Sequence, residues 1–356
     1  MDTKVVTIST EEQEDGQFTP EQELILRQAG DILKKGGLVA FPTETVYGLG
    51  GDALNRNSSR KIYAAKGRPS DNPLIVHVNH LEDIYAIAEV SKAAEKIAKR
   101  FWPGPLTMIL PKTELVPGET TGGLDTVAIR MPSHPVARKL IEYGGGYVAA
   151  PSANASGKPS PTLAKYVIED LDGKIEMIID GGEVGIGLES TIIDLTVSTP
   201  QILRPGYITE EMLKEALGKV DTDVTMMNAD SGQAPKAPGM KYRHYAPKGE
   251  LTIVTGESAK VVDHINRLAR EDMGRSEKVG VIATEQTFSY YRADVVKCIG
   301  SREDENAIAK HLYRILREFD DEGVTKIYSE GFAVEGFGQA IMNRLLKAAG
   351  HHVIEV

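Results

Sequence analysis

A long break in hydrophobic periodicity divides this chain into two segments that each alternate strands with helices. Between residues 219 and 249 the sequence is polar, with scattered Gly and Pro, which is typical of a linker. On both sides of the break, short apolar runs alternate with longer stretches of helical spacing. The length of 356 residues also favours two domains. We therefore predict an α/β domain over residues 1–218, a linker over 219–249 and a second α/β domain over 250–356.

The order of the predicted elements indicates a different sheet in each domain. In the first domain, some apolar strands are separated by helices and others follow each other directly, as LTMIL and TVAIRM do. This order predicts a mixed, twisted sheet instead of a purely parallel one. In the second domain, regular alternation predicts a smaller Rossmann-like fold. No G-x-G-x-x-G turn follows its first strand, LTIVTG, so no motif indicates a bound dinucleotide.

Composition narrows the class of protein. The net charge of −10 argues against a chain that wraps nucleic acid over its whole surface, although a local basic site is compatible with it. The single cysteine, Cys298, excludes a disulfide framework and a site built from several thiolates, and its strand VVKCI predicts a small buried side chain. No apolar run approaches the length of a membrane span and the first residues are acidic, so we expect a cytoplasmic protein without a membrane partner.

The segment from Ala40 to Val78 carries a dense set of different polar groups. Within it, Lys66 and Arg68 flank a glycine and precede a rigid proline, and the planar fork of Arg68 suits phosphate. Asn72 adds an amide, and His77 lies on the following strand, where a histidine is more often structural than functional when it stands alone. Together these side chains favour an anionic, phosphate-bearing ligand.

The loop PTETVYGLGG begins just beyond a strand end, where α/β sheets commonly face their ligands. Thr43 and Thr45 supply hydroxyls to it. Glu44 is either an outward charge or the partner of a metal or an amine, and Tyr47 is expected in the core. The glycines of GLGG are predicted to form a tight turn that lets the backbone approach a ligand.

Later motifs place further polar groups at strand ends. Arg130 ends the apolar strand TVAIR and is a candidate clamp for a carboxylate, the alternative being a surface residue. Ser190 stands at the start of the strand STIIDL, and Arg204 at the end of another. The Gly/Pro loop AAPSANASGKPSPT is either an ordinary turn or a cradle for base and ribose or phosphate. It carries Ser152, Asn154, Ser156 and Ser160.

The linker contains the cluster APGMKYRHYAP, in which tyrosines alternate with basic residues. Disordered linkers rarely carry such a cluster, whereas a segment that folds over a ligand would use it. We therefore predict that this part of the linker acts as a lid over the site.

Several common catalytic motifs are missing. The sequence has no G-x-S-x-G nucleophile motif and no G-x-x-x-x-G-K-[ST] phosphate loop, and no His, Cys and Asp residues have zinc spacing. We therefore predict no metal held by the protein alone.

The motifs taken in order resemble one known family. FPTETVYGLG, KGRPSDNPLIVH, WPGPLT, AIRMPSHP, AAPSANASGKPSPT, GLESTIIDL and LRPG are similar to the YrdC-like threonylcarbamoyl-AMP synthases. APGMKYRHYAP and the trailing α/β segment resemble the longer, two-domain members of that family. The resemblance implies a YrdC-like mixed sheet joined by the linker to the Rossmann-like domain. It also implies an activity, the synthesis of threonylcarbamoyl-AMP and pyrophosphate from L-threonine, bicarbonate and ATP.

The resemblance further implies a role for individual residues. Lys66 and Arg68 are implied to act on the phosphates as catalytic residues. The residues implied to bind threonine are Thr45, His77, Arg130, Ala150 and Ser190. Those implied to bind ATP are Arg68, Asn72, Thr126, Ser152, Asn154, Ser160, Arg204 and Tyr242 of the linker. Mg²⁺ is expected to enter with ATP.

The same resemblance implies partners and leaves alternatives. The product would pass to a tRNA threonylcarbamoyl transferase complex that forms threonylcarbamoyladenosine, and weak contact with tRNA itself is compatible with this role. One alternative is a carbamoyl-adenylating enzyme of the same fold, but such hydrogenase-maturation proteins carry Cys-rich zinc modules and this chain has one cysteine. The other is a non-enzymatic RNA-binding module, which the acidic charge and the lack of an arginine-rich segment disfavour.

Overall fold

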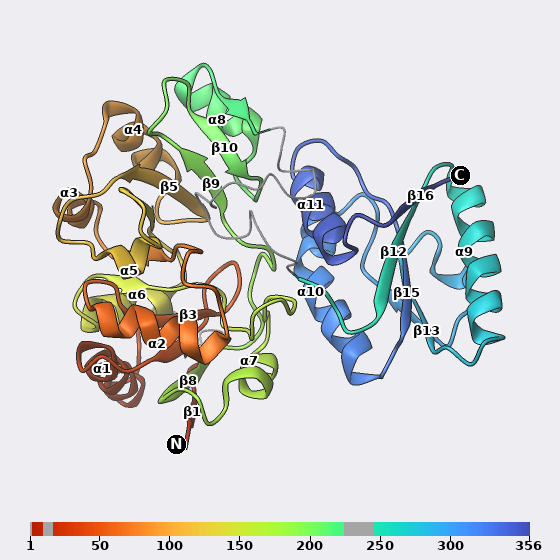
Figure 1. Ribbon diagram of the computed structural model, residues 1–356, viewed down its shortest axis with the longest axis horizontal. Helices are drawn as coiled ribbons and strands as arrows, with labels where there is room; N and C mark the ends of the chain where they lie inside the picture. The colour runs from red at the N-terminus through yellow and green to blue at the C-terminus, as the bar shows by residue number, and fades with distance from the viewer. Residues whose placement is uncertain (1, 10–16, 224–244) are drawn as a thin grey trace.

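The computed structural model describes residues 2–9, 17–223 and 245–356, which form two sheets in two domains (Figure 1). Among these residues the first sheet has 11 strands in the order β1-β8-β2-β3-β7-β4-β6-β5-β9-β10-β11. Its strands are β1 (Lys4–Thr7), β2 (Val39–Phe41), β3 (Gly48–Asp52), β4 (Ile75–His77), β5 (Leu106–Pro111), β6 (Thr126–Arg130), β7 (Val148–Ala149), β8 (Met177–Asp180), β9 (Thr191–Asp194), β10 (Gln201–Arg204) and β11 (Asp221–Thr222). The helices around it are α1 (Pro20–Lys34), α2 (Arg56–Lys66), α3 (Ile84–Ile87), α4 (Lys92–Phe101), α5 (Gly118–Thr121), α6 (Pro135–Tyr143), α7 (Ala164–Leu171) and α8 (Glu210–Leu217).

The first sheet is mixed, as the order of the elements predicts. Strand β4 pairs parallel with β6 and antiparallel with β7, and β5 pairs antiparallel with β6 but parallel with β9. The capping box expected at the start of α1 is present, because Thr19 and Gln22 cap each other's backbone N–H groups. Helix α1 buries Leu26 and Leu33 against the sheet beside α6. Strand β11 lies in the segment predicted as linker and pairs with β10.

The prediction of a tight turn at GLGG is wrong, because these residues form strand β3, which pairs with β2 and β7. The glycines serve close packing across the sheet. A Cβ atom on Gly50 would lie 2.9 Å from side-chain atoms of both Phe41 and Val148, closer than real Cβ contacts come. Tyr47, just before the strand, is fully buried, as predicted for a core residue.

The second domain is a smaller parallel α/β domain, in agreement with the predicted Rossmann-like pattern. Its five strands have the order β14-β13-β15-β12-β16, and every pair between them is parallel. They are β12 (Glu250–Thr255), β13 (Val279–Ala283), β14 (Val295–Cys298), β15 (Lys326–Glu330) and β16 (Val353–Glu355), and the helices are α9 (Ser258–Met273), α10 (Glu305–Asp321) and α11 (Gly338–Ala348). Helices α10 and α11 lie between this sheet and the first domain, whereas α9 covers the far face (Figure 1).

The prediction of a buried Cys298 is wrong. The residue does end a strand, β14, but this strand lies at the edge of the second sheet and the cysteine is exposed. In the described parts of the chain, no helix combines the length and the apolar character needed to cross a membrane.

Candidate active site

A cavity in the first domain gathers most of the residues singled out in the sequence. Its space, counting the part open to solvent, is about 710 Å³, a size typical of small-molecule sites. The predicted site residues that line it are Thr45, Lys66, Arg68, His77, Arg130, Ala150, Ser152, Asn154, Ser160, Ser190 and Arg204. Three predicted ATP-binding residues are not among its described lining. Asn72 is buried beside it, Thr126 begins β6 at the opposite end from Arg130, and Tyr242 lies outside the described residues.

Two neighbouring parallel strands bring His77 and Arg130 together. The two residues face each other in register at the ends of β4 and β6, and both are buried. Burial and the nearby positive charge of Arg130 lower the pKa of His77 to about 3, so its ring is neutral near pH 7. His77 Nδ1 lies 3.1 Å from the carbonyl oxygen of Ile75. Because a carbonyl only accepts, Nδ1 carries the ring proton and Nε2 is an acceptor.

Arg130 pairs with the carboxylate of Glu44. The Nη2 atom lies 2.8 Å from Oε1 of Glu44, and both side chains are largely buried. Burial by itself would raise the pKa of Glu44, but Arg130 outweighs this effect and lowers it. Glu44 is therefore not the outward charge that the sequence left open, and its partner in the structure is a guanidinium, which was not among the predicted alternatives. Nε of Arg130 has no hydrogen-bond partner among the described residues, so a donor is left for a ligand.

Hydroxyl groups surround this charged corner. Thr45 Oγ1 lies 2.9 Å from Thr43 Oγ1. On the other side, Ser190 Oγ lies 2.7 Å from Thr107 Oγ1 and accepts a hydrogen bond from Arg204 Nη2 at 3.1 Å. The corner can therefore offer a carboxylate clamp, a neutral imidazole and several hydroxyls to one small polar molecule.

A second, cationic wall begins at the end of α2. Lys66 is the last residue of the helix, and Gly67 ends it in the left-handed conformation with φ of 63°, which turns the chain toward Arg68. Lys66 Nζ donates to the carbonyl oxygens of Ser152 and Asn154. Burial and the proximity of Arg68 lower the pKa of Lys66 well below its usual value. Arg68 donates to the carbonyl oxygens of Asn72 and Pro73, which orients its guanidinium.

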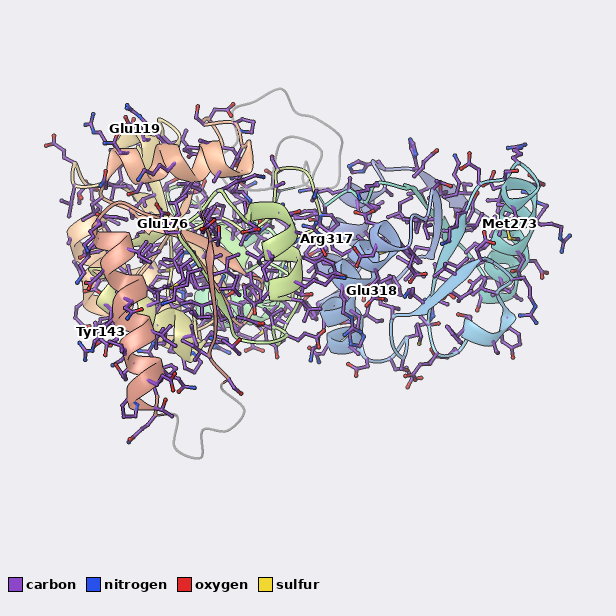
Figure 2. All side chains as sticks on the ribbon, turned by 90° about the horizontal axis from the view of Figure 1, so that it is seen from below. Glu119, Tyr143, Glu176, Met273, Arg317 and Glu318 are labelled. Atoms are coloured by element: carbon purple, nitrogen blue, oxygen red, sulfur yellow. The ribbon has the colours of Figure 1, made fainter. Side chains whose placement is uncertain are left out.

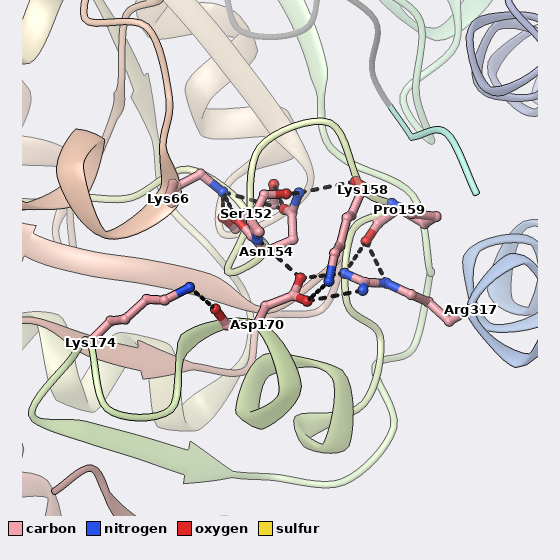
Figure 3. Close-up of polar contacts among 9 residues, drawn as sticks. Lys66, Ser152, Asn154, Lys158, Pro159, Asp170, Lys174 and Arg317 are labelled. Atoms are coloured by element: carbon pink, nitrogen blue, oxygen red, sulfur yellow. Dashed lines mark hydrogen bonds and ion pairs between the residues drawn. The ribbon is translucent and has the colours of Figure 1, made fainter. Parts of the chain in front are cut away.

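The segment 151–160, called here the serine loop, is held by its own side chains. Ser152 Oγ donates to Asn154 Oδ1 at 2.5 Å, and Asn154 Nδ2 donates to the carbonyl oxygens of Ala155 and Lys158 at 2.8 and 3.0 Å. Lys66 contacts this loop directly (Figure 3). The sequence left two interpretations of this loop, a cradle for a ligand or an ordinary turn. In the structure the loop lines the cavity.

Glu189 is a site residue that sequence reasoning did not single out. It lines the cavity and accepts hydrogen bonds from Ser160 Oγ at 2.6 Å and from Arg344 Nε at 2.8 Å. Burial alone would raise its pKa, but the positive charges of Arg344 and Arg204 lower it to about 2. The only signal in the sequence was an acidic residue directly before Ser190 in GLESTIIDL.

Of the aromatic–basic cluster in the linker, Tyr245 is the first residue that the structure describes. It is buried, lines the cavity and stacks on Tyr313 of α10 with ring centroids 5.1 Å apart. Its φ of 64° is unusual for a residue other than glycine. The predicted lid residues before it lie outside the described residues.

The cavity suits an anion better than a metal held by protein ligands. Across residues 2–9, 17–223 and 245–356, no group of three or more His, Cys, Asp or Glu side chains is arranged to hold a metal ion. Glu189, which lines the cavity, and Glu44, which lies between the lining residues Thr43 and Thr45, are each paired with an arginine. Fold and cavity together define an α/β protein whose first domain has a cavity suited to a small anionic ligand, because buried cations line it.

Comparisons with known proteins identify the family. A family model described as "Telomere recombination" (Sua5, YciO and YrdC) matches residues 31–206, and one described as "Threonylcarbamoyl-AMP synthase, C-terminal domain" matches residues 208–350. The chain is 50% identical to threonylcarbamoyl-AMP synthase of Pyrococcus abyssi, over 94% of this chain and 97% of that protein. It is 48% identical to the Bacillus subtilis enzyme of the same name, over 92% and 94%.

A solved structure agrees over the same length. Sua5 of P. abyssi complexed with L-threonine superimposes with a TM-score of 0.92 at 47% identity, covering 99% of this chain and all of that one. The chain therefore belongs to the Sua5/YrdC family of threonylcarbamoyl-AMP synthases, and the resemblance inferred from the motifs is confirmed.

Proposed function

We propose that this chain joins L-threonine, bicarbonate and ATP into threonylcarbamoyl-AMP and pyrophosphate. The observation that carries the proposal is a single cavity with two differently built walls. One wall has a buried arginine with an unpaired Nε–H beside a neutral histidine, and the other has Lys66 and Arg68 beside the serine loop. The first suits an amino acid and the second a polyphosphate.

Threonine fits the corner around Arg130. Its carboxylate would accept hydrogen bonds from the guanidinium, and its hydroxyl and amine would meet Thr45, Ser190 and the acceptor nitrogen of His77. Ala150 and Ile75 line the same cavity and offer apolar contact to the side-chain methyl group. A neutral His77 is important here, because a charged ring would repel both Arg130 and the ammonium group of the substrate.

ATP fits the opposite wall. The fork of Arg68 and the ammonium of Lys66 would bind the phosphates, with Arg204 as a further cation of the cavity. The hydroxyls and amides of the serine loop would bind the ribose and base. Binding of the polyphosphate also favours the charged form of Lys66, since an anion counteracts the lowering of its pKa by burial.

The reaction needs positioning more than a nucleophilic side chain. The threonine amine combines with bicarbonate to give a carbamate, with loss of water. A carbamate oxygen then bonds to the α-phosphorus of ATP while the bond from that phosphorus to the bridging oxygen breaks, and pyrophosphate leaves with the electron pair. Cations around the phosphates and correct alignment supply the catalysis.

Mg²⁺ is proposed to enter with ATP and to supply further charge neutralisation on the phosphates. Because the acidic side chains at the cavity are paired with arginines, phosphate oxygens, water and loop hydroxyls such as those of Ser152 and Ser160 would be its ligands. The product is proposed to pass to a tRNA threonylcarbamoyl transferase complex in the cytoplasm, with at most weak contact between this chain and tRNA.

The test is release of pyrophosphate that requires ATP, threonine and bicarbonate together. Lys66→Ala should abolish most of it, because it removes a buried cation from the phosphate wall. Lys61→Ala is the matched control: this lysine lies on the same helix but donates to the carbonyl oxygen of Gly36, outside the cavity lining. Pyrophosphate release by the wild type that is independent of threonine, or full activity of Lys66→Ala, would contradict the proposal.

A further inference from the structure

Two arginines of the second domain reach into the first. One contacts the serine loop directly, and the other binds a carboxylate that also bonds the last serine of the loop. Arg317 comes from α10 and Arg344 from α11, the two helices that lie against the first domain (Figure 1). Arg317 lies at the junction of the domains (Figure 2). Both side chains are buried, Arg317 with 3% and Arg344 with 0% of its surface exposed. Each forms an ion pair with a buried carboxylate of the first domain.

Arg317 binds a backbone carbonyl and a carboxylate at the same time. Its Nε and Nη2 donate to the carbonyl oxygen of Pro159 at 3.0 and 2.8 Å. Its Nη1 and Nη2 also donate to the carboxylate of Asp170 at 3.2 and 2.6 Å (Figure 3). Such a two-sided contact requires the planar fork of arginine, and a lysine cannot reproduce it.

Asp170 connects Arg317 to the serine loop. Its carboxylate accepts hydrogen bonds from the backbone N–H of Ala155 at 3.0 Å and from Lys158 Nζ at 2.6 Å. Ala155 follows Asn154, whose carbonyl oxygen accepts from Lys66. A continuous chain of polar contacts therefore runs from α10 of the second domain, through Asp170 and the loop, to the proposed phosphate-binding lysine.

Arg344 is connected to the other end of the serine loop through Glu189. It donates to Glu189 at 2.8 Å and to the carbonyl oxygen of Pro205 at 3.0 Å, and Glu189 accepts from Ser160 Oγ at 2.6 Å. Tyr313 of α10 donates to Glu189 at 3.0 Å. The two arginines thus fix residues at both ends of the segment from Ala155 to Ser160.

We propose that Arg317 and Arg344 are positioning residues that shape the serine loop for ATP, so that the second domain preorganises the nucleotide site of the first. This inference rests on the proposed function. A loop ordered before the ligand arrives spares the ligand the entropy cost of ordering it. Loss of either arginine would therefore weaken ATP binding much more than threonine binding. The hydrogen bonds of Arg317 go to Pro159 and Asp170, and those of Arg344 go to Glu189, Pro205 and Asn343, so neither arginine is bonded to Arg130, Thr45 or His77.

The test variant is Arg317→Lys, which keeps the positive charge opposite Asp170 but loses the fork. We expect its KM for ATP, and its Kd for α,β-methylene-ATP in calorimetry, to rise by roughly 10- to 100-fold, the scale of a misplaced catalytic group. The Kd for threonine should stay within twofold of the wild type. Arg344→Lys should show the same split.

Arg314→Ala is the matched control. It removes another arginine of α10 that reaches the first domain, but its partners are Glu183 of that domain and Glu318 of its own helix, both outside the serine loop. It should leave the KM for ATP unchanged. Hydrogen exchange gives a readout that does not depend on catalysis: the N–H of Ala155 should exchange faster in Arg317→Lys than in the wild type or in Arg314→Ala.

The outcomes separate this inference from the proposed function. A wild-type enzyme that releases no pyrophosphate would contradict the function. A wild-type Kd for α,β-methylene-ATP in a folded Arg317→Lys would overturn the positioning role, as would equal weakening by Arg314→Ala.

Discussion

The two domains differ in how completely the hydrogen bonds of some buried polar side chains are satisfied. In the first, buried polar atoms around the cavity are left without hydrogen-bond partners among the described residues, as Nε of Arg130 and Oδ1 of Asn72 are. In the second, the buried carboxylate of Glu330 is saturated. It accepts from Tyr291 at 2.8 Å and from Thr284 at 3.4 Å, and it is also bound by Thr287 and Arg302.

This difference indicates where the protein can form hydrogen bonds with a ligand. A buried polar atom without a partner costs about 1–3 kcal/mol, so it is retained where something else completes it. A saturated carboxylate has no capacity for a ligand and stabilises the fold. The unpaired polar atoms at the cavity therefore leave capacity for a ligand, whereas the Glu330 carboxylate stabilises the second domain itself.

The first test of this contrast measures threonine binding. Arg130→Ala removes a guanidinium that would donate two charge-assisted hydrogen bonds, so we expect the Kd for threonine to rise by at least about 100-fold. Calorimetry should detect no comparable loss for ATP. Arg138→Ala, which removes an arginine bonded to Asn79, is the matched control with normal threonine affinity. Unchanged threonine binding by Arg130→Ala would remove Arg130 from the site.

In the second domain, loss of a buried polar group should lower the stability of the fold instead of weakening ligand binding. Glu330→Ala leaves Tyr291, Thr287 and Arg302 without their buried acceptor, so we expect the free energy of unfolding to fall by about 3–5 kcal/mol. Urea unfolding measures this loss. At temperatures where the variant stays folded, its Kd values for ATP and threonine should match the wild type; a large change in either would mean that this carboxylate takes part in binding.

A smaller effect concerns the choice of amino acid. Serine lacks the methyl group that Ala150 and Ile75 can contact in the cavity. We expect kcat/KM for serine to be lower than for threonine by an amount equivalent to about 1–3 kcal/mol, as for other single-methyl discriminations. The ratio is measured by competition between the two amino acids in the pyrophosphate assay. Equal rates would show that the methyl group makes no contact.

The smallest effect is a slope of stability with pH. The folded-state pKa of His77 is about 3, against an ordinary value of 6.5, so between these values the unfolded chain binds a proton that the folded chain does not. His77 therefore lowers stability as the pH falls below 6.5, by about 1.4 kcal/mol per pH unit. His77→Asn should remove that part of the slope in urea unfolding between pH 6.5 and 4.5. A variant that follows the wild-type curve would contradict the neutral, buried state of the histidine.

Local patterns were enough to predict the alternation of elements and most of the cavity lining. Strands such as TVAIR are apolar and end in a polar residue, and adjacent parallel strands bring such ends together. Strand β3 was missed because GLGG has the local composition of a turn, and only its pairing with β2 and β7 makes it a strand. Cys298 was misassigned because the sequence does not tell an edge strand from a central one.

The contacts between domains could not be predicted. Arg317 meets Asp170 across 147 residues of sequence, and Arg344 meets Glu189 across 155. An arginine on an amphipathic helix is usually exposed, and nothing local distinguishes these two. Glu189 was overlooked for the same reason, since its role depends on partners far along the chain.

Arg317 and Arg344 bind carboxylates that lie much earlier in the sequence, and this separation determines when their contacts can form during synthesis. Asp170 and Glu189 leave the ribosome 147 and 155 residues of synthesis before their arginine partners, which at about 5–20 residues per second is a delay of roughly 7–30 s. During that interval Asp170 and Glu189 have no arginine from the second domain. Synthesis of the last helix is thus the event that completes the network that we propose shapes the nucleotide site, and a chain that stops before α11 lacks the contacts of Arg344.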